Sequence, residues 1–143
     1  NLTDLFYVGF YAYRKLKDYE MADSVLSAVR ERAPTFLEGH YYHGRALHKW
    51  ENATDSAGNP LDTTVAGRAA DPYKAFVKRV EESGQTEKQK SKLNTAYGYL
   101  MVHYYRQNDM EATKKWHKKL TAIDPDNEVA KEIKRAFNQN TDG

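Results

Sequence analysis

Hydrophobic and polar positions alternate with a helical period along almost the whole chain. Near the N-terminus, Phe6, Phe10 and Tyr13 recur at helical spacing and predict a helix from about Thr3, as its N-cap, to Lys17. Later segments repeat this pattern, with helices expected between the turn at 17–18 and Pro34, over 36–50, from 72 to about 84, and over 86–107, 109–123 and 126–137.

One segment breaks the helical period. Residues 51–70 are rich in Gly, Asn, Thr and Asp and are predicted to form a loop. Asp71 followed by Pro72 is typical of an N-cap and a first helical position. In the last helix, Val129 and Ile133 share an apolar face.

The sequence also repeats itself. Asp18 lies 16 positions before Pro34, and Asp109 lies 16 positions before Pro125. The pattern predicts seven helices in antiparallel pairs, with an unpaired helix at the end. A repeat array needs such a helix, because its last pair would otherwise expose an apolar stacking face.

The residues at the repeated positions resemble those of the tetratricopeptide repeat (TPR) family, whose unit of about 34 residues is a helix hairpin. The first unit matches at Phe6, Gly9, Phe10, Tyr13, Ala22, Leu26, Val29 and Pro34. The second matches on its first helix at His40, His43, Gly44 and Leu47. The third matches at Tyr97, Leu100, Met101, Tyr104, Thr113, His117, Leu120 and Pro125, with Thr113 where the family usually has Ala.

This resemblance implies an all-α fold, a right-handed superhelix of antiparallel helix pairs, in one domain over 1–143. We expect units at about 3–34, 35–85 and 86–125 and a capping helix at about 126–138. The second unit would hold about 23 additional residues, divided between an inserted loop at about 51–70 and a longer connection around 84–92. Several alignments of its second helix, over 73–80, fit equally well. The C-terminal half also resembles the end of multi-repeat proteins of Bacteroidetes-type bacteria, many of which carry a signal peptide, and this alone implies an extracytoplasmic location.

Composition narrows the possible functions. The formal net charge of +2 is too small to favour nucleic acid as a partner. The absence of Cys excludes disulfides and thiolate chemistry, and no apolar run has the roughly 18 to 20 residues of a membrane span. The chain holds 11 Tyr against 5 Phe, and Tyr suits positions that pack on one side and meet a ligand on the other.

The resemblance implies that the first helix of each unit lines a concave groove. The implied contact residues are Tyr7, Tyr11 and Arg14, then Tyr41, Arg45 and His48, then Tyr99, Val102, Tyr105 and Arg106. Tyr faces and Arg side chains would suit an extended protein or peptide segment with aromatic and acidic groups. The alternatives are that these tyrosines only cover helix surface, or that another segment of the protein fills the groove.

A rival hypothesis is a structural role, in which the chain stacks on further repeats or on a second copy of itself. An apolar patch left exposed by Phe6 and Phe10 would favour this hypothesis. The chaperone-binding members of the family clamp a C-terminal carboxylate with Lys and Asn. Here the matching places hold Tyr7, Tyr11, Tyr42, Thr95 and Tyr99, so that clamp is not expected.

Catalysis and metal binding are not expected from the sequence. His40 and His43 have a spacing that can hold zinc, but both fall on packing positions and no third ligand stands at a matching position. No phosphate-binding loop, nucleophile elbow or carboxylate pair is recognisable, and the segment 55–62 does not match a calcium-binding loop. We therefore expect a non-enzymatic module without a cofactor.

Overall fold

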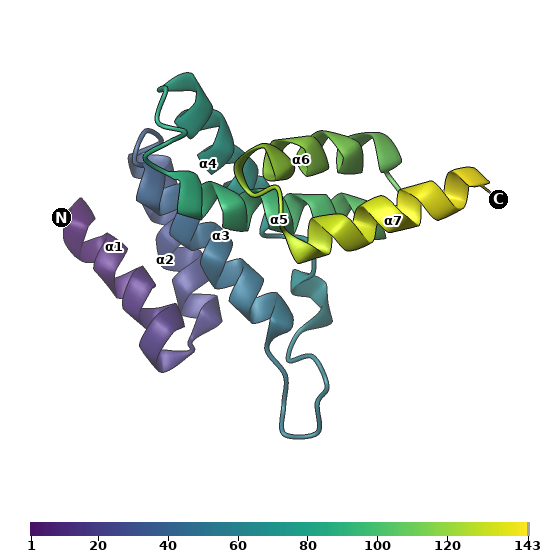
Figure 1. Ribbon diagram of the computed structural model, residues 1–143. Coiled ribbons are helices and arrows are strands. Elements are labelled where there is room, and N and C mark those ends of the chain that lie inside the picture. Colours follow the sequence, from purple (N-terminus) through teal and green to yellow (C-terminus); the bar gives the residue numbers. More distant parts are fainter. Residues whose placement is uncertain (143) are drawn as a thin grey trace. The chain divides into compact units, whose positions relative to one another are not determined.

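The computed structural model describes residues 1–142, so Gly143, the last residue of the expected domain, lies outside it. Within this range the chain is all-α, with seven α-helices that pack as sequential antiparallel pairs (Figure 1). The chain divides into two compact units, residues 1–84 and 85–143. The division falls between the second and third repeats expected from the sequence.

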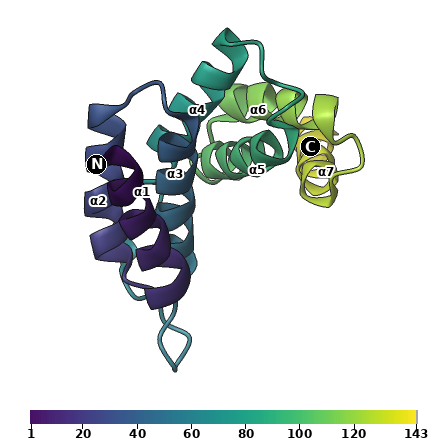
Figure 2. The same ribbon diagram turned by 90° about the vertical axis from the view of Figure 1, so that its left-hand side faces the viewer.

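Unit 1 contains the first four α-helices and two short helical segments. The helices are α1 (Leu2–Tyr11), α2 (Tyr19–Arg32), α3 (Leu37–Asn52) and α4 (Ala70–Glu82). A π-helical segment, η1 (Ala12–Leu16), continues α1, and a 3-10 turn, η2 (Thr63–Val65), precedes α4. Helix α2 packs against both α1 and α3, and α3 packs against α4 (Figure 2).

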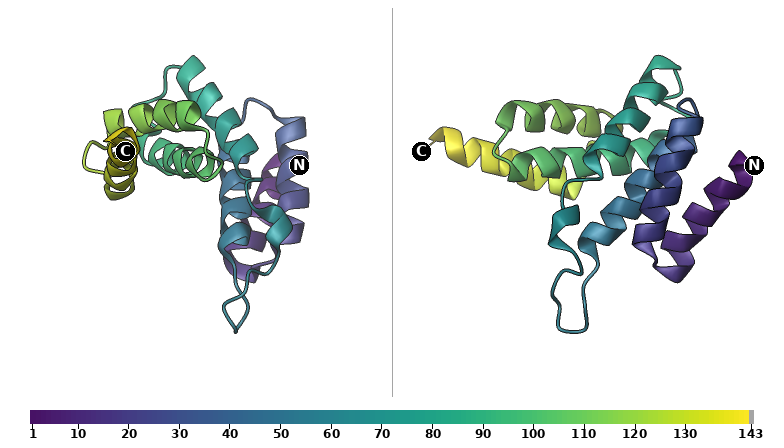
Figure 3. Two further views of the ribbon diagram at one scale, coloured as in Figure 1. Left: turned by 90° about the vertical axis from the view of Figure 1, so that its right-hand side faces the viewer. Right: turned by 180° about the vertical axis from the view of Figure 1, so that it is seen from behind.

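Unit 2 contains α5 (Lys90–Arg106), α6 (Met110–Ile123) and α7 (Glu128–Asp142). Helices α5 and α6 form an antiparallel hairpin, and α7 packs on α6 (Figure 3). The buried Ala130 and Ile133 lie on the inner face of α7. His117 on α6 donates a hydrogen bond from Nε2 to the Ala130 carbonyl at 3.0 Å, which ties the two helices together.

The two sequence repeats adopt the same local structure. Asp18 and Asp109 are the N-caps of α2 and α6, and each side chain accepts a hydrogen bond from the backbone N–H three residues later at 3.1 Å. The residue before each cap is left-handed, with φ of 54° at Lys17 and 59° at Asn108. Both helices have 14 residues, and each ends two positions before a proline, Pro34 after α2 and Pro125 after α6. The spacing in the sequence thus corresponds to two equivalent helix hairpins.

Three helix starts differ from the sequence-based expectation. Asn1, not Thr3, caps α1, because its side chain accepts from the N–H of Asp4 at 2.9 Å. Helix α4 begins at Ala70 without a side-chain cap, so Asp71 is inside its first turn. Helix α5 begins at Lys90 rather than at Thr86, because residues 86–89 form turns.

The core of unit 1 is aromatic and tightly packed. Phe6 is buried and meets the rings of Phe36 and Tyr42 at centroid distances of 5.2 and 5.9 Å. Gly44 permits a close approach of α3 and α4, since a Cβ there would lie 2.7 Å from the Tyr73 ring. This is far inside van der Waals contact, so the second repeat depends on a residue without a side chain at this position.

The segment between α3 and α4 extends beyond the end of α3 as a narrow loop (Figure 1). An antiparallel bridge joins Thr54 to Pro60, and the carboxylate of Asp55 accepts hydrogen bonds from the N–H groups of Ala57 and Asn59. The loop is therefore held by its own turn. At its other end, the N–H of Gly67 donates to Glu51 of α3 at 2.6 Å.

Candidate functional site

The first group of expected contact residues lies on the exposed face of α1 and η1. Tyr7 and Tyr11 are 59% and 55% exposed, and Arg14 is also exposed. The Arg14 guanidinium lies 5.1 Å from the centre of the Phe10 ring, a cation–π distance that keeps the charge beside this face. Helical spacing thus brings two tyrosines and one arginine together on a single surface.

The second group, on α3, is more enclosed. Tyr41 is only 8% exposed, because its ring packs on Phe76 at 5.2 Å and on Tyr42 at 5.0 Å. Arg45 and His48 are partly buried. This group therefore offers polar edges rather than broad aromatic faces.

The third group lies on α5, in unit 2, and its residues differ in their exposure to solvent. Tyr99 is 8% exposed, and its ring stacks on His103 at a centroid distance of 6.0 Å. Tyr105 is partly buried and Arg106 is exposed, while Val102, the remaining expected contact residue, is partly buried.

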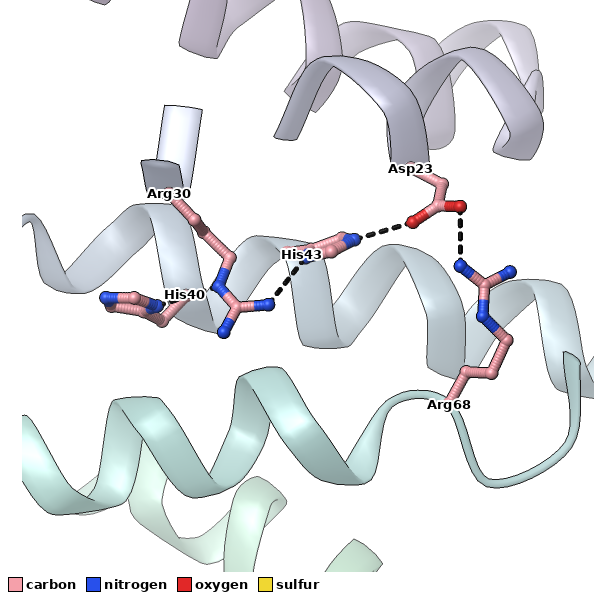
Figure 4. A network of polar contacts seen from close by, with 5 residues as sticks. All are labelled: Asp23, Arg30, His40, His43 and Arg68. Atoms are coloured by element: carbon pink, nitrogen blue, oxygen red, sulfur yellow. Dashed lines mark hydrogen bonds and ion pairs between the residues drawn. The ribbon is translucent and has the colours of Figure 1, made fainter. Parts of the chain in front are cut away.

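A polar network that the sequence analysis missed joins α2, α3 and the segment before α4 (Figure 4). Asp23 accepts from Nε2 of His43 at 2.7 Å and from Nη2 of Arg68 at 2.8 Å. Arg30 donates from Nη1 to Nδ1 of His43 at 3.1 Å and from Nε to Nδ1 of His40 at 2.9 Å. The network thus runs unbroken through five side chains.

The network determines the protonation of both histidines. Arginine can only donate, so Nδ1 of His40 and of His43 must be an acceptor without a proton. The proton of His43 is on Nε2 and points to Asp23, and that of His40 is donated to the Pro34 carbonyl at 2.6 Å. Both imidazoles are neutral, and neither has a nitrogen left for a metal ion or for general-base catalysis.

Burial lowers the pKa of His43, and the Arg30 charge acts in the same direction, against the hydrogen bond to Asp23. Burial also lowers the pKa of His40, with the charges of Arg30 and Arg79 adding to it and the hydrogen bond to Pro34 opposing it. Burial acts to raise the pKa of Asp23, but hydrogen bonds from His43 and Arg68 bring it below the usual value. The stable state is therefore two neutral histidines beside an ionised aspartate.

The places of His40 and His43 in the repeat pattern predicted packing positions rather than a metal site, and the structure buries both side chains. Their partners are not visible in this way. Asp23 lies 20 positions from His43 and 45 positions from Arg68 along the chain. No local pattern in the sequence links residues so far apart.

A second polar contact joins α3 to α4. The hydroxyl of the fully buried Tyr73 lies 3.0 Å from Nδ1 of His48. Burial raises the pKa of Tyr73 beyond its usual range, so its hydroxyl keeps its proton. Burial, followed by the Arg45 charge, lowers the pKa of His48 to about 4.

Within residues 1–142 no three His, Cys, Asp or Glu side chains are grouped so that they could hold a metal ion. No helix in the same range has both the length and the apolar character needed to cross a bilayer.

No family model matches the sequence, and comparison with curated proteins found no match. Among solved structures, the chain is similar to the crystal structure of the C-terminal part of a TPR repeat-containing protein from Cytophaga hutchinsonii, a member of the Bacteroidetes. The TM-score is 0.69 and the sequence identity 26%. The match covers 92% of this chain and 46% of the solved chain, so this chain spans less than half of that length.

The structural match confirms both resemblances inferred from the residues, to TPR proteins in general and to the C-terminal part of a Bacteroidetes protein in particular. The chain is therefore an all-α helical repeat module with a TPR-like fold.

Proposed function

We propose that this module is not an enzyme and binds a protein or peptide through tyrosines and arginines on the first helix of each repeat. The observation that carries the proposal is the exposure of Tyr7 and Tyr11 on one face of α1, next to Arg14. Exposed adjacent aromatic rings with a neighbouring guanidinium match the residue types that dominate binding energy at protein interfaces. Tyr41, Arg45 and His48 would add polar edges, and Tyr99, Tyr105 and Arg106 the corresponding contacts in unit 2.

A partner would gain more from α1 than from α3. The rings of Tyr7 and Tyr11 are accessible, whereas most of the Tyr41 ring is already covered by Phe76 and Tyr42. We therefore propose that Tyr7 and Tyr11 are the main anchors of the partner. The sequence alone did not distinguish them from the tyrosines of α3 and α5.

The test is a lysate pull-down with quantitative mass spectrometry, using wild type and a Tyr7→Ser, Tyr11→Ser variant. The matched control is Met21→Ser, Leu61→Ser, which removes two hydrophobic side chains that are 44% and 54% exposed elsewhere on unit 1. Circular dichroism confirms that all three proteins are folded.

We expect a partner that wild type and control retain equally and that the tyrosine variant binds at least about tenfold more weakly. Equal retention by all three proteins would contradict the proposal.

The alternative, a stacking or oligomerisation role, is favoured by a different observation. Val8 and Leu16 are 49% and 59% exposed. Phe6 is buried and Phe10 is partly buried, so they do not provide the patch that stacking was expected to use. A concentration-dependent oligomer in sedimentation equilibrium that is lost in Val8→Ser, Leu16→Ser would support this alternative.

A further inference from the structure

The outward face of α6 carries a concentration of positive charge. Four of the six residues from 114 to 119 are lysines: Lys114, Lys115, Lys118 and Lys119. Helical spacing places all four on the side of α6 opposite the buried Thr113, Trp116 and Leu120. Glu111 is the only acidic residue in the sequence of this helix. The helix therefore presents a strongly basic face to its surroundings.

Little in unit 2 compensates this charge. Lys114, Lys115 and Lys118 are exposed, and none of them lies within ion-pair distance of a carboxylate among the side chains that the structure describes. None lies in the last turn of α6, where the helix dipole would favour a cation. Like charges four positions apart, such as Lys114 and Lys118, repel each other across one helical turn. These lysines therefore cost stability in the isolated chain.

The repeat fold does not need lysines at these places. Helix α2 has the same length as α6 and the same Asp cap. Counted from that cap, the places of Lys114, Lys115, Lys118 and Lys119 are held in α2 by Asp23, Ser24, Ser27 and Ala28. The first of these places thus carries a carboxylate in unit 1 and an ammonium group in unit 2. The lysines belong to unit 2 in particular and not to the helix hairpin itself.

Aromatic rings hold two of the lysines close to the helix surface. The Nζ atom of Lys114 lies 5.7 Å from the centre of the Phe137 ring on α7, and that of Lys115 lies 4.8 Å from the centre of the Trp116 ring. The exposed Lys134 is one helical turn from Phe137 and adds a further charge from α7. The α6–α7 basic surface is defined here as Lys114, Lys115, Lys118 and Lys134.

The chemistry of this surface distinguishes between anionic partners. Its cations are all lysines, whereas the paired donors of arginine are better suited to phosphate groups. Trp116 is buried and Phe137 is partly buried, so neither ring is free to enter a bilayer or to stack on a base. Separate ammonium groups suit several carboxylates, each of which can meet one of them. These features favour an acidic protein segment over a membrane or a nucleic acid.

We propose that the α6–α7 basic surface binds a protein segment rich in Glu and Asp. None of the residues assigned to the proposed peptide-binding function lies on α6 or α7, so this interaction is a separate one. It also uses none of the five positions that match the chaperone-peptide clamp of the family. Because the lysines are exposed, the interaction should weaken as salt is added.

The first experiment is isothermal titration calorimetry of wild type with a synthetic peptide of alternating Glu and Ser, capped at both ends. The control peptide has Gln in place of Glu. We expect binding of the Glu peptide that weakens at higher ionic strength, and no binding of the Gln peptide. Equal heats from the two peptides would overturn the proposal.

Two variants with the same change in net charge test the position of the surface. Lys114→Gln, Lys118→Gln should weaken binding of the Glu peptide by roughly threefold to thirtyfold, the range for the loss of two exposed ion pairs. Lys88→Gln, Lys90→Gln, which changes two exposed lysines at the start of α5, should leave the affinity nearly unchanged. An equal loss in both variants would show a response to net charge alone and would overturn the site.

A further measurement needs no variant, so a folding defect cannot obscure it. In the amide NMR spectrum of wild type, the Glu peptide should shift the signals of α6 and α7, while those of residues 86–92 and of α1 stay in place. Shifts spread evenly over all lysine-bearing segments of the chain would contradict a defined surface.

The other anionic partners are tested with phosphatidylserine vesicles and with duplex DNA. Binding of either that depends on Lys114 and Lys118, without binding of the Glu peptide, would overturn the assignment to an acidic protein segment. The Tyr7→Ser, Tyr11→Ser variant should bind the Glu peptide as wild type does. Failure of the tyrosine-based function would therefore leave this inference standing, and failure of this inference would leave that function standing.

Discussion

The contact of α2 with α3 and the contact of α5 with α6 are held by different interactions. Between α2 and α3, the buried His40 and His43 belong to a network of directed hydrogen bonds that includes Asp23 and Arg30. In the α5–α6 hairpin, the fully buried side chains are mainly apolar, with Leu93, Leu100, Met101 and Leu120 among them. The buried Thr113 satisfies its hydroxyl locally by donating to the Asp109 carbonyl at 2.6 Å.

This difference has a physical consequence. An apolar contact depends on volume and area, so it is insensitive to pH and is lost gradually as side chains are shortened. A buried polar network depends on every partner being present in one protonation state, because an unmatched buried group costs its full desolvation. The same helix-hairpin fold thus contains one contact that is sensitive to protonation and one that is not.

The largest effect is expected from shortening the apolar contact. Leu100→Ala should lower the free energy of unfolding by about 2–5 kcal/mol, because it removes a fully buried side chain and leaves a cavity. Urea denaturation measures the loss, and hydrogen exchange should place it in peptides of α5 and α6. A loss below about 1 kcal/mol would show that this contact is not packed as described.

Removal of the central acceptor should break the polar contact. Asp23→Ala leaves His43 and Arg68 without their shared partner and should cost about 1–3 kcal/mol, with faster hydrogen exchange in α2 and α3. Asp126→Ala, a control at an exposed carboxylate, should change the stability by no more than about 0.5 kcal/mol. Equal effects of the two substitutions would mean that the network does not stabilise the fold.

Acid should weaken unit 1. His40, His43 and His48 have pKa values below the usual one, so each contribution is fully present above about pH 6.5. As the pH falls, the unfolded chain binds protons first, and the free energy of unfolding decreases; for His48 this occurs between about pH 6.5 and about pH 4. Asp23, with its lowered pKa, would add a further loss at still lower pH.

Urea denaturation at about pH 7 and about pH 4.5 measures this dependence, and hydrogen exchange shows where it occurs. His48→Gln has no imidazole at that position to titrate, so its stability should fall less between the two values than that of wild type. An equal fall in both proteins would argue against the neutral, buried state of His48.

The smallest effect is expected at the exposed end of the network. Arg68→Ala removes one of the two hydrogen bonds to Asp23, but the Arg68 side chain is 46% exposed. Exposed ion pairs contribute little, so the loss should not exceed about 1 kcal/mol. A larger loss in thermal or urea unfolding would indicate that Arg68 also secures the segment before α4.

Much of the fold follows from short-range patterns. The Asp caps, the turns before them and the prolines after the helices recur at equal spacing, and the structure reproduces both hairpins. The exact residues at which helices begin were harder to predict from the sequence. Asn1 displaced Thr3 as a cap, and residues 86–89 became turns, because several neighbouring residues can satisfy the same backbone groups.

The candidate contact residues could likewise be predicted only in part. Helical spacing predicts that Tyr7, Tyr11 and Arg14 share one face of α1, and they do. The exposure of the tyrosine side chains differs: Tyr7 is 59% exposed, whereas Tyr41 and Tyr99 are each 8% exposed. Exposure depends on the neighbouring helices, which the local pattern does not contain.

The sequence by itself thus determined the helices, their pairing and the repeat family that they resemble, because caps, turns and helical periodicity act over a few residues. Only the tertiary structure decided which distant polar side chains meet. Arg68 reaches Asp23 across 45 positions of the chain, and His43 reaches the same carboxylate across 20. Such contacts arise from the packing of helices that are far apart in the sequence, and no pattern of neighbouring residues records them.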